Sequence, residues 1–183
     1  MAGRKYKKDY DLVETRSEKG KYSLEAEYKG KTYGIENPPG DVKRFAVVII
    51  VLLAFMWCLF IAAFTQNGNF GRTLYVIIPY AFNAVPLYLC SDSAVRLLWT
   101  KPPYRQRDYD RVTRARGYVI AVWVLTGIAA AGSGITLLAA QKGMFLADAL
   151  FFVFCAGIAG LGSAVYITHR RLKFTEVLPS ERA

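Results

Sequence analysis

Hydrophobic residues along the chain fall into four long runs, and the segments between them hold nearly all of the charge. A helix needs about 20 apolar residues to cross a hydrocarbon core of about 30 Å. Short polar joints connect the first run to the second and the third to the fourth, so successive helices would run antiparallel. The pattern predicts an all-α integral membrane protein with an antiparallel bundle of four transmembrane helices. The runs cover residues 45–64, 74–91, 118–140 and 144–167.

A pattern of period two precedes the first run. Apolar and polar residues alternate from Tyr22 to Tyr28, which is typical of a strand with one apolar face. Residues 17–20 suit a four-residue turn, and residues 29–30 suit a tight hairpin turn because Gly30 can adopt a positive φ. We therefore expect a small N-terminal three-stranded β-meander, with a disordered basic tail as the alternative. Its strands would lie at about residues 10–16, 21–28 and 31–35.

The distribution of cations predicts the orientation. Of the 24 Lys and Arg residues, residues 1–44 hold 11, residues 92–116 hold 7 and the tail after Ile167 holds 4. Each short joint holds one, Arg72 or Lys142. Because cytoplasmic loops carry the excess of cations, we expect a multipass protein of the plasma membrane with both termini in the cytoplasm. The expected parts are a cytoplasmic segment (1–43), a transmembrane domain (44–168) and a cytoplasmic tail (169–183).

The net charge of +10 raises the question of nucleic-acid binding. The orientation rule and attraction to anionic lipids already account for the excess, and the chain lacks the basic–aromatic motifs of RNA-binding sheets. We therefore expect no nucleic-acid partner. We expect arginines after the second run to contact anionic lipid headgroups, either as general anchors or by recognising one headgroup. These arginines are Arg105, Arg107, Arg111 and Arg114.

Small residues spaced four apart distinguish the third and fourth runs. Such spacing lets two helix backbones approach closely within a membrane. Because a joint of three residues connects these runs, the two helices must be antiparallel neighbours. We expect the small residues to pack this helical hairpin together, and the alternative is a face that binds another subunit. They are Gly127, Ala131, Ala156, Gly160 and Ala164.

The second run contains the polar and helix-breaking residues. Pro79, Asn83 and Pro86 are spaced four and three apart and would share one face of a helix. Each proline frees a backbone carbonyl one turn earlier, and a freed carbonyl needs a partner inside a membrane. This stripe should therefore face protein rather than lipid. At the cytoplasmic end of the run, Asp92 and Arg96 are four apart and can form an ion pair.

No catalytic or metal-binding motif occurs in the sequence. The three cysteines form no CxxC pair, and there is no GxSxG, HExxH or phosphate-binding glycine loop. The single histidine, His169, fits a cation at the end of the fourth helix, and Asp148 fits the start of that helix. We therefore expect no enzyme, no metal and no cofactor.

These observations favour an accessory or scaffolding subunit that acts through helix–helix and protein–protein contacts. Its expected partners are anionic lipids and either another membrane protein or further copies of the chain. One alternative is a small-solute transporter or channel component that uses the proline-containing second helix. A membrane-embedded enzyme is the third.

Overall fold

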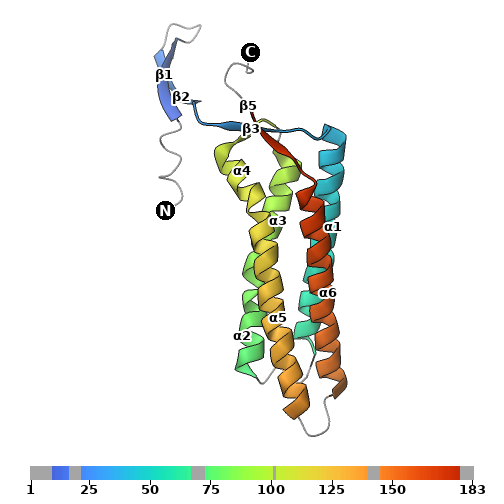
Figure 1. The fold of residues 1–183 in the computed structure, drawn as a ribbon. Coiled ribbons are helices and arrows are strands. Elements are labelled where there is room, and N and C mark those ends of the chain that lie inside the picture. The colour runs from blue at the N-terminus through green and yellow to red at the C-terminus, as the bar shows by residue number, and fades with distance from the viewer. Residues whose placement is uncertain (1–9, 17–21, 67–72, 101, 140–144, 178–183) are drawn as a thin grey trace.

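A computed structural model describes residues 10–16, 22–66, 73–100, 102–139 and 145–177 (Figure 1). Most of these residues are helical. The helices are α1 (Pro39–Phe64), α2 (Leu74–Phe82), α3 (Ala84–Trp99), α4 (Gln106–Thr113), α5 (Ala115–Ala139) and α6 (Phe145–Arg170). The strands are β1 (Tyr10–Arg16), β2 (Tyr22–Tyr28), β3 (Thr32–Ile35), β4 (Tyr104–Arg105) and β5 (Phe174–Val177).

Four helical stretches are long and apolar enough to cross a membrane, which confirms that part of the prediction and suggests a multipass membrane protein. The second stretch joins α2 to α3 across Asn83, and the third joins α4 to α5 across Arg114. The stretches cover Pro39–Phe64, Leu74–Trp99, Gln106–Thr136 and Leu146–Arg170.

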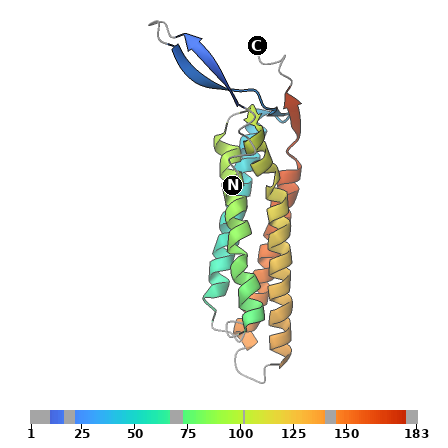
Figure 2. The same ribbon diagram turned by 90° about the vertical axis from the view of Figure 1, so that its left-hand side faces the viewer.

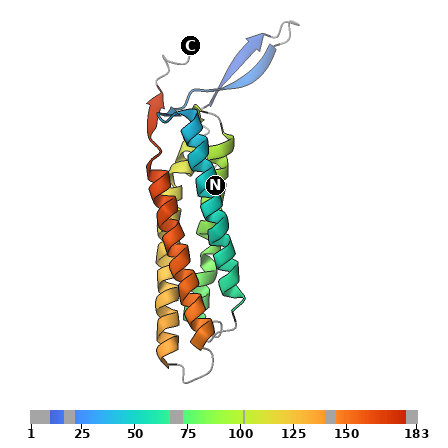
Figure 3. The same ribbon diagram turned by 90° about the vertical axis from the view of Figure 1, so that its right-hand side faces the viewer.

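The long helices lie side by side (Figures 1 and 3). Helix α6 packs between α1 and α5, and α3 packs against both α1 and α5. Helix α2 packs on α5 at the end of the bundle where α1 finishes. We call this end the loop end, and the opposite end, which carries β3, β4 and β5, the sheet end.

The inner faces of the helices form one apolar core. In α1 the buried residues recur every three or four positions, as one face of a helix requires. They are Ala46, Ile49, Leu53, Met56, Phe60 and Ala63. The outer face of α1 is also apolar, because Val47, Val51 and Phe55 are exposed. A helix that is apolar all round but buried on one side only is suited to a lipid environment on its other side.

The first three β-strands lie at the predicted positions, but their pairing differs from a meander, and β4 and β5 were not predicted. Strands β1 and β2 form a separate antiparallel hairpin that projects from the bundle (Figure 2). Strand β3 instead lies between β4 and β5 in an antiparallel sheet of order β4-β3-β5. The predicted antiparallel pairing of the first two strands is therefore confirmed, whereas the pairing of the third strand with the second is wrong. The three-stranded sheet joins segments from three regions of the chain.

Two features keep β3 apart from β2, namely the pairing of β3 with other strands and the link between β2 and β3. Both edges of β3 are occupied, one by β4 and the other by β5, so β2 has no edge to pair with. The Tyr28 hydroxyl donates to the Lys31 carbonyl (2.9 Å) and accepts from the backbone N–H of Gln106 (3.1 Å). The predicted hairpin turn at residues 29–30 is thus a connection, which Tyr28 ties to the start of α4.

Candidate functional site

The second spanning stretch is interrupted at Asn83, between its two prolines. Pro79 lies inside α2, and Pro86 lies in the first turn of α3. The Asn83 backbone N–H donates to the Tyr80 carbonyl three residues earlier (3.1 Å), which replaces a regular α-helical bond. Pro86 has no N–H to offer the Phe82 carbonyl. The sequence pattern of this stripe therefore coincides with a local break in helical bonding.

The stripe faces the interior of the bundle. Asn83 and Pro86 are buried and Pro79 is half-buried. The Asn83 amide Nδ2 donates to the Thr126 hydroxyl of α5 across 3.2 Å, and both side chains are buried. The Asn83 Oδ1 has no hydrogen-bond partner among the described residues. The neutral amide–hydroxyl pair can hold two helices together, but it supplies neither an acid nor a base.

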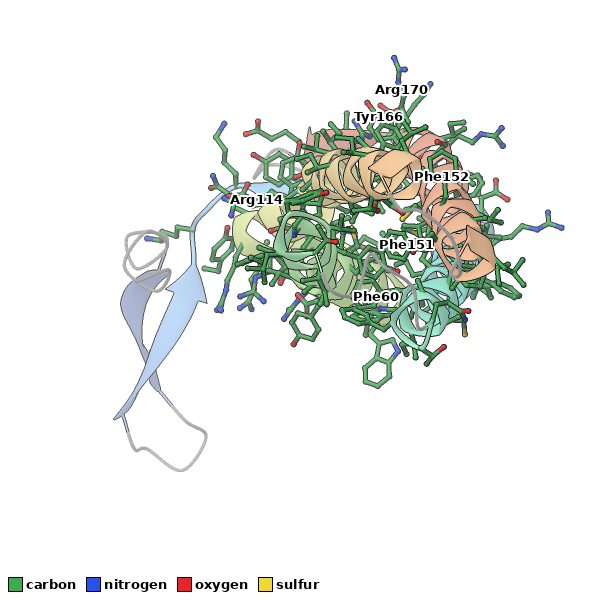
Figure 4. All side chains as sticks on the ribbon, turned by 90° about the horizontal axis from the view of Figure 1, so that it is seen from below. Phe60, Arg114, Phe151, Phe152, Tyr166 and Arg170 are labelled. Carbon is green, nitrogen blue, oxygen red and sulfur yellow. The ribbon has the colours of Figure 1, made fainter. Side chains whose placement is uncertain are left out.

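An aromatic cluster lies next to the stripe, towards the loop end. Tyr80 is buried, and its hydroxyl donates to the Phe60 carbonyl of α1 (3.1 Å). Its ring centroid is 4.9 Å from that of Phe60 and 4.9 Å from that of Phe151 in α6. Figure 4 shows Phe60 and Phe151 directed into the bundle, whereas Phe152 lies on its outside. Tyr80 thus links α2 to α1 and α6, while Asn83 links it to α5.

At the sheet end, ion pairs connect α3 to the following segment. The Arg96 Nε donates to the Asp92 Oδ2 at 2.9 Å, and its Nη1 is 3.8 Å from the Asp108 Oδ1 of α4. The Ser93 hydroxyl lies 3.0 Å from the Arg111 carbonyl and donates a hydrogen bond to it. These contacts hold α4 against the end of α3.

The four arginines that follow the second span are not equivalent. Arg105, Arg107 and Arg114 are exposed, and Arg111 is half-buried. The Arg105 guanidinium carbon lies 5.5 Å from the ring centroid of Tyr28, and the Arg114 Nη2 lies 3.9 Å from the Asp110 Oδ2. Arg105 and Arg114 therefore already have partners within the chain.

The small-residue stripes of α5 and α6 lie on the outside of the bundle. Gly127, Ala131, Ala156 and Gly160 are exposed, and Ala164 is half-buried. A Cβ added at Gly127 or Gly160 would meet nothing within 4 Å. The expectation that these residues pack α5 onto α6 is therefore wrong for this hairpin, since the two helices meet through other faces.

Different glycines make the close contacts between helices. A Cβ at Gly162 of α6 would lie 2.8 Å from the Trp123 Nε1 of α5, and a Cβ at Gly157 would lie 2.8 Å from the Leu59 Cδ1 of α1. The Trp123 indole N–H donates to the Ala159 carbonyl at 3.1 Å. The bulky indole selects which face of α6 turns towards α5. This face of α6 is identified by its partner Trp123, which lies on another helix. The spacing of small residues within α6 therefore could not predict it.

His169 is buried, not an exposed cation at the end of α6. The Arg116 Nε donates to the His169 Nδ1 (3.3 Å), and the Arg116 Nη2 donates to the His169 carbonyl (3.3 Å). The short joint between α5 and α6 could have revealed this contact, because Arg116 and His169 lie nearly equally far from it in sequence. Asp148, in the first turn of α6, is also buried.

Within the described ranges, no group of three or more His, Cys, Asp and Glu residues is arranged to hold a metal ion. Comparison of the chain with protein-family models, with curated proteins and with solved structures found no match.

Proposed function

We propose that the protein is a multipass component of the plasma membrane that acts as an accessory or scaffolding subunit. It associates with another membrane protein or with further copies of itself. Both termini would face the cytoplasm, because the cation-rich segments lie at the sheet end and before α1. The exposed apolar faces of the long helices support membrane insertion.

The observation that carries the proposal is the outward position of the small residues on α5 and α6. On α6, Ala156 and Gly160 lie on the exposed face between Val153 and Ile167. On α5, Gly127 and Ala131 lie between exposed bulky residues in the same way. Each face is thus a shallow strip with larger side chains at its ends.

Such strips are suited to contact with another helix. Inside a membrane no hydrophobic force drives two helices together, so close packing of backbones supplies much of the association. Gly127 and Gly160 leave room for such an approach, because nothing lies within 4 Å of the position of an added Cβ. Glycine also lowers helix stability by about 1 kcal/mol relative to alanine, so its place on an outer face favours a contact function.

The test is whether bulk on these strips separates a complex without unfolding the chain. We would co-express two differently tagged copies, extract them in mild detergent and measure their co-purification and the native mass of the complex. Gly127→Leu and Gly160→Leu should each reduce association by at least tenfold. Ala81→Leu, at an exposed position on α2, is the matched control and should leave association unchanged.

If the chain does not bind itself, the same variants should release whichever membrane protein co-purifies with the wild type. A variant with leucine at both glycines is tested in the same way. The proposal is contradicted if this variant keeps the native mass of the complex and retains every co-purifying protein. Thermal unfolding in detergent must remain close to wild type in the variants, which separates loss of contact from loss of fold.

The exposed Arg107 and the neighbouring arginines support a second part of the proposal, contact with anionic headgroups on the cytoplasmic side. Specific recognition of one headgroup by this set would require fixed partners, whereas Arg105 and Arg114 already contact Tyr28 and Asp110. We therefore propose general anchoring for these arginines.

One observation favours a transporter or channel component as a second candidate. The buried Asn83 Oδ1 has no partner in the described part of the chain, and an unpaired buried oxygen can bind a polar solute. Uptake of small solutes into vesicles should then change in Asn83→Leu while the complex stays intact. If the wild type and Asn83→Leu take up solute equally, or if neither takes up any, Asn83 serves as a contact between helices.

A further inference from the structure

A partly enclosed pocket of about 250 Å³ lies at the sheet end, where β3, the start of α1 and the end of α3 meet. Its walls are mainly apolar. Ile35, Val42, Leu97 and Leu98 contribute aliphatic surface, and the buried Tyr104 contributes its ring. The pocket lies apart from the outer strips of α5 and α6 and from the stripe around Asn83.

Hydrogen bonds connect the walls to the segment after α6 and to each other. The Asn37 Nδ2 donates to the Arg171 carbonyl (3.3 Å), and the Asn37 Oδ1 accepts from the Lys173 N–H (2.9 Å). On the other side, the Tyr104 hydroxyl donates to the Leu97 carbonyl (3.5 Å). Burial raises the pKa of Tyr104, so this hydroxyl keeps its proton. Both sides of the pocket are therefore tied into the sheet end by hydrogen bonds.

Lys43 brings a positive charge to the rim of the pocket. Lys43 is the charged residue among the described residues that line it, and its side chain belongs to the first turns of α1. Asp41, the acid in the first turn of α1, does not line the pocket. At the start of α1 the Asp41 and Val42 amides donate to the Pro38 carbonyl (3.0 and 3.1 Å), so the positive charge at the pocket comes from Lys43. An anion would complement this edge.

The position of the pocket along the bundle matches the boundary between membrane and water. Trp99, the last residue of α3, is 80% exposed beside the pocket residue Leu98. Tryptophan gathers at headgroup level in membrane proteins. On the proposed orientation this level belongs to the cytoplasmic leaflet, which carries the anionic lipids.

We infer that this pocket binds one anionic phospholipid, with the phosphate against Lys43 and the adjoining part of an acyl chain against Val42, Leu97 and Leu98. The volume fits part of a lipid, because pockets that enclose whole drug-sized ligands measure about 300–1,000 Å³. This inference depends on the proposed membrane insertion but not on the proposed association with another subunit.

The purified full-length chain in a mild uncharged detergent provides the test. We would add phosphatidylglycerol, phosphatidylcholine or inorganic phosphate, count retained lipids by native mass spectrometry and follow the thermal unfolding temperature. Phosphatidylglycerol should be retained at one molecule per chain and raise the unfolding temperature. Phosphatidylcholine should bind several-fold more weakly, and inorganic phosphate should have no effect.

Variants identify the site. Lys43→Gln should weaken phosphatidylglycerol binding by about fivefold, as expected for one cation near an anionic headgroup. Arg44→Gln is the matched control, because Arg44 is exposed next to Lys43 but does not line the pocket. Leu98→Trp should fill the apolar part and reduce binding of both lipids, with helix content by circular dichroism as the check on folding.

Three results would overturn the inference: equal binding of the two lipids, equal weakening by Lys43→Gln and Arg44→Gln, or equal stabilisation by inorganic phosphate. The last two would indicate diffuse attraction and a simple anion site, respectively. Failure of the proposed function is distinguishable, since a chain recovered from cells without detergent would contradict membrane insertion directly. If Gly160→Leu loses association and the wild type shows no selective lipid binding, only the inferred lipid site is contradicted.

Discussion

Gly160 and Gly162 lie two positions apart on α6 and therefore face nearly opposite directions. Gly162 is buried against the Trp123 indole, whereas Gly160 is exposed with open space beyond its Cα. The same residue type thus serves two purposes within one turn. At Gly162 the missing side chain makes room for a contact within the chain, and at Gly160 the room is on the outside.

Alanine at these two positions should have opposite effects on stability. Gly162→Ala would place a Cβ 2.8 Å from the Trp123 Nε1 and disturb its bond to the Ala159 carbonyl, and such overpacking costs about 1–3 kcal/mol. Gly160→Ala should be neutral or stabilise by up to about 1 kcal/mol through helix propensity. Thermal unfolding in detergent, followed by tryptophan fluorescence, measures both. An equal loss of stability in the two variants would contradict the packing described here.

The contact between Asn83 and Thr126 should be weak. Hydrogen bonds between helices in membranes average about 0.6 kcal/mol in double-mutant cycles. We therefore expect Asn83→Leu, Thr126→Val and the double variant to give a coupling free energy of about that size in detergent unfolding. Ser163→Ala serves as a control, because the Ser163 hydroxyl bonds the Ala159 carbonyl of its own helix. A coupling energy above about 2 kcal/mol would mean that Asn83 has a larger role than joining the second spanning stretch to α5.

At the residue scale, contacts within one helix are predictable from the sequence. Asp92 and Arg96 are one helical turn apart, so their pairing at 2.9 Å follows from helix geometry alone. The roles of Gly160 and Gly162 depend on a tryptophan in another helix. A spacing rule applies to every face that carries small residues and does not say which face meets which neighbour.

At the scale of elements, the sheet β4-β3-β5 joins the segment before α1, the link between α3 and α4, and the segment after α6. Strand β5 supplies four paired residues to β3, and the Lys31 ammonium forms an ion pair with the Glu176 carboxylate at 3.0 Å. Asn37 bonds the Lys173 backbone next to this strand. Strand β5 therefore secures the entry to α1.

Removal of β5 should loosen the entry to α1 while the helices persist. In a chain that ends at Leu172, β3 loses one of its two partners, so trypsin should cleave after Lys29 and Lys31 several-fold faster. Helix content by circular dichroism should stay nearly unchanged. A chain that ends at Val177 retains β5 and is the matched control. Identical cleavage rates in the two chains would show that β5 does not stabilise this region.

The three N-terminal strands could be located from the sequence, but β4, β5 and the partners of β3 could not. The alternation of apolar and polar residues marks β2 well, since it lies within one segment. Strand β4 has two residues, Tyr104 and Arg105, too few to display any period. Because β3 acquires its partners only when the helices bring distant segments together, a local meander was the simplest interpretation and was incorrect.

At the scale of the whole molecule, the four long apolar stretches were predictable because their length and composition alone identify them. Which face of each helix points into the bundle and which points outward was less predictable. Helices that are apolar on every side carry little amphipathic signal, and their rotation about the axis is set by packing. In α5, for example, Val122 is buried and Val124 is exposed although both are valines.

Cysteine labelling tests the proposed orientation. In a chain with Cys58, Cys90 and Cys155 replaced, Thr65→Cys places a thiol at the exposed loop end and Arg107→Cys places one at the exposed sheet end. An impermeant thiol reagent applied to intact cells should modify the first and not the second. Both should react after permeabilisation. The reverse pattern would invert the orientation and move the proposed lipid site to the other leaflet.

The sheet at the end of the bundle also imposes an order on synthesis. Strand β3 precedes every helix, yet both of its partners emerge from the ribosome later, and β5 does so only after α6. The sheet can therefore close only once the polypeptide has been made through the last helix. Until then the entry to α1 lacks its ties to Arg171 and Lys173. Closure of the sheet consequently marks the nascent chains in which all four spanning stretches have been completed.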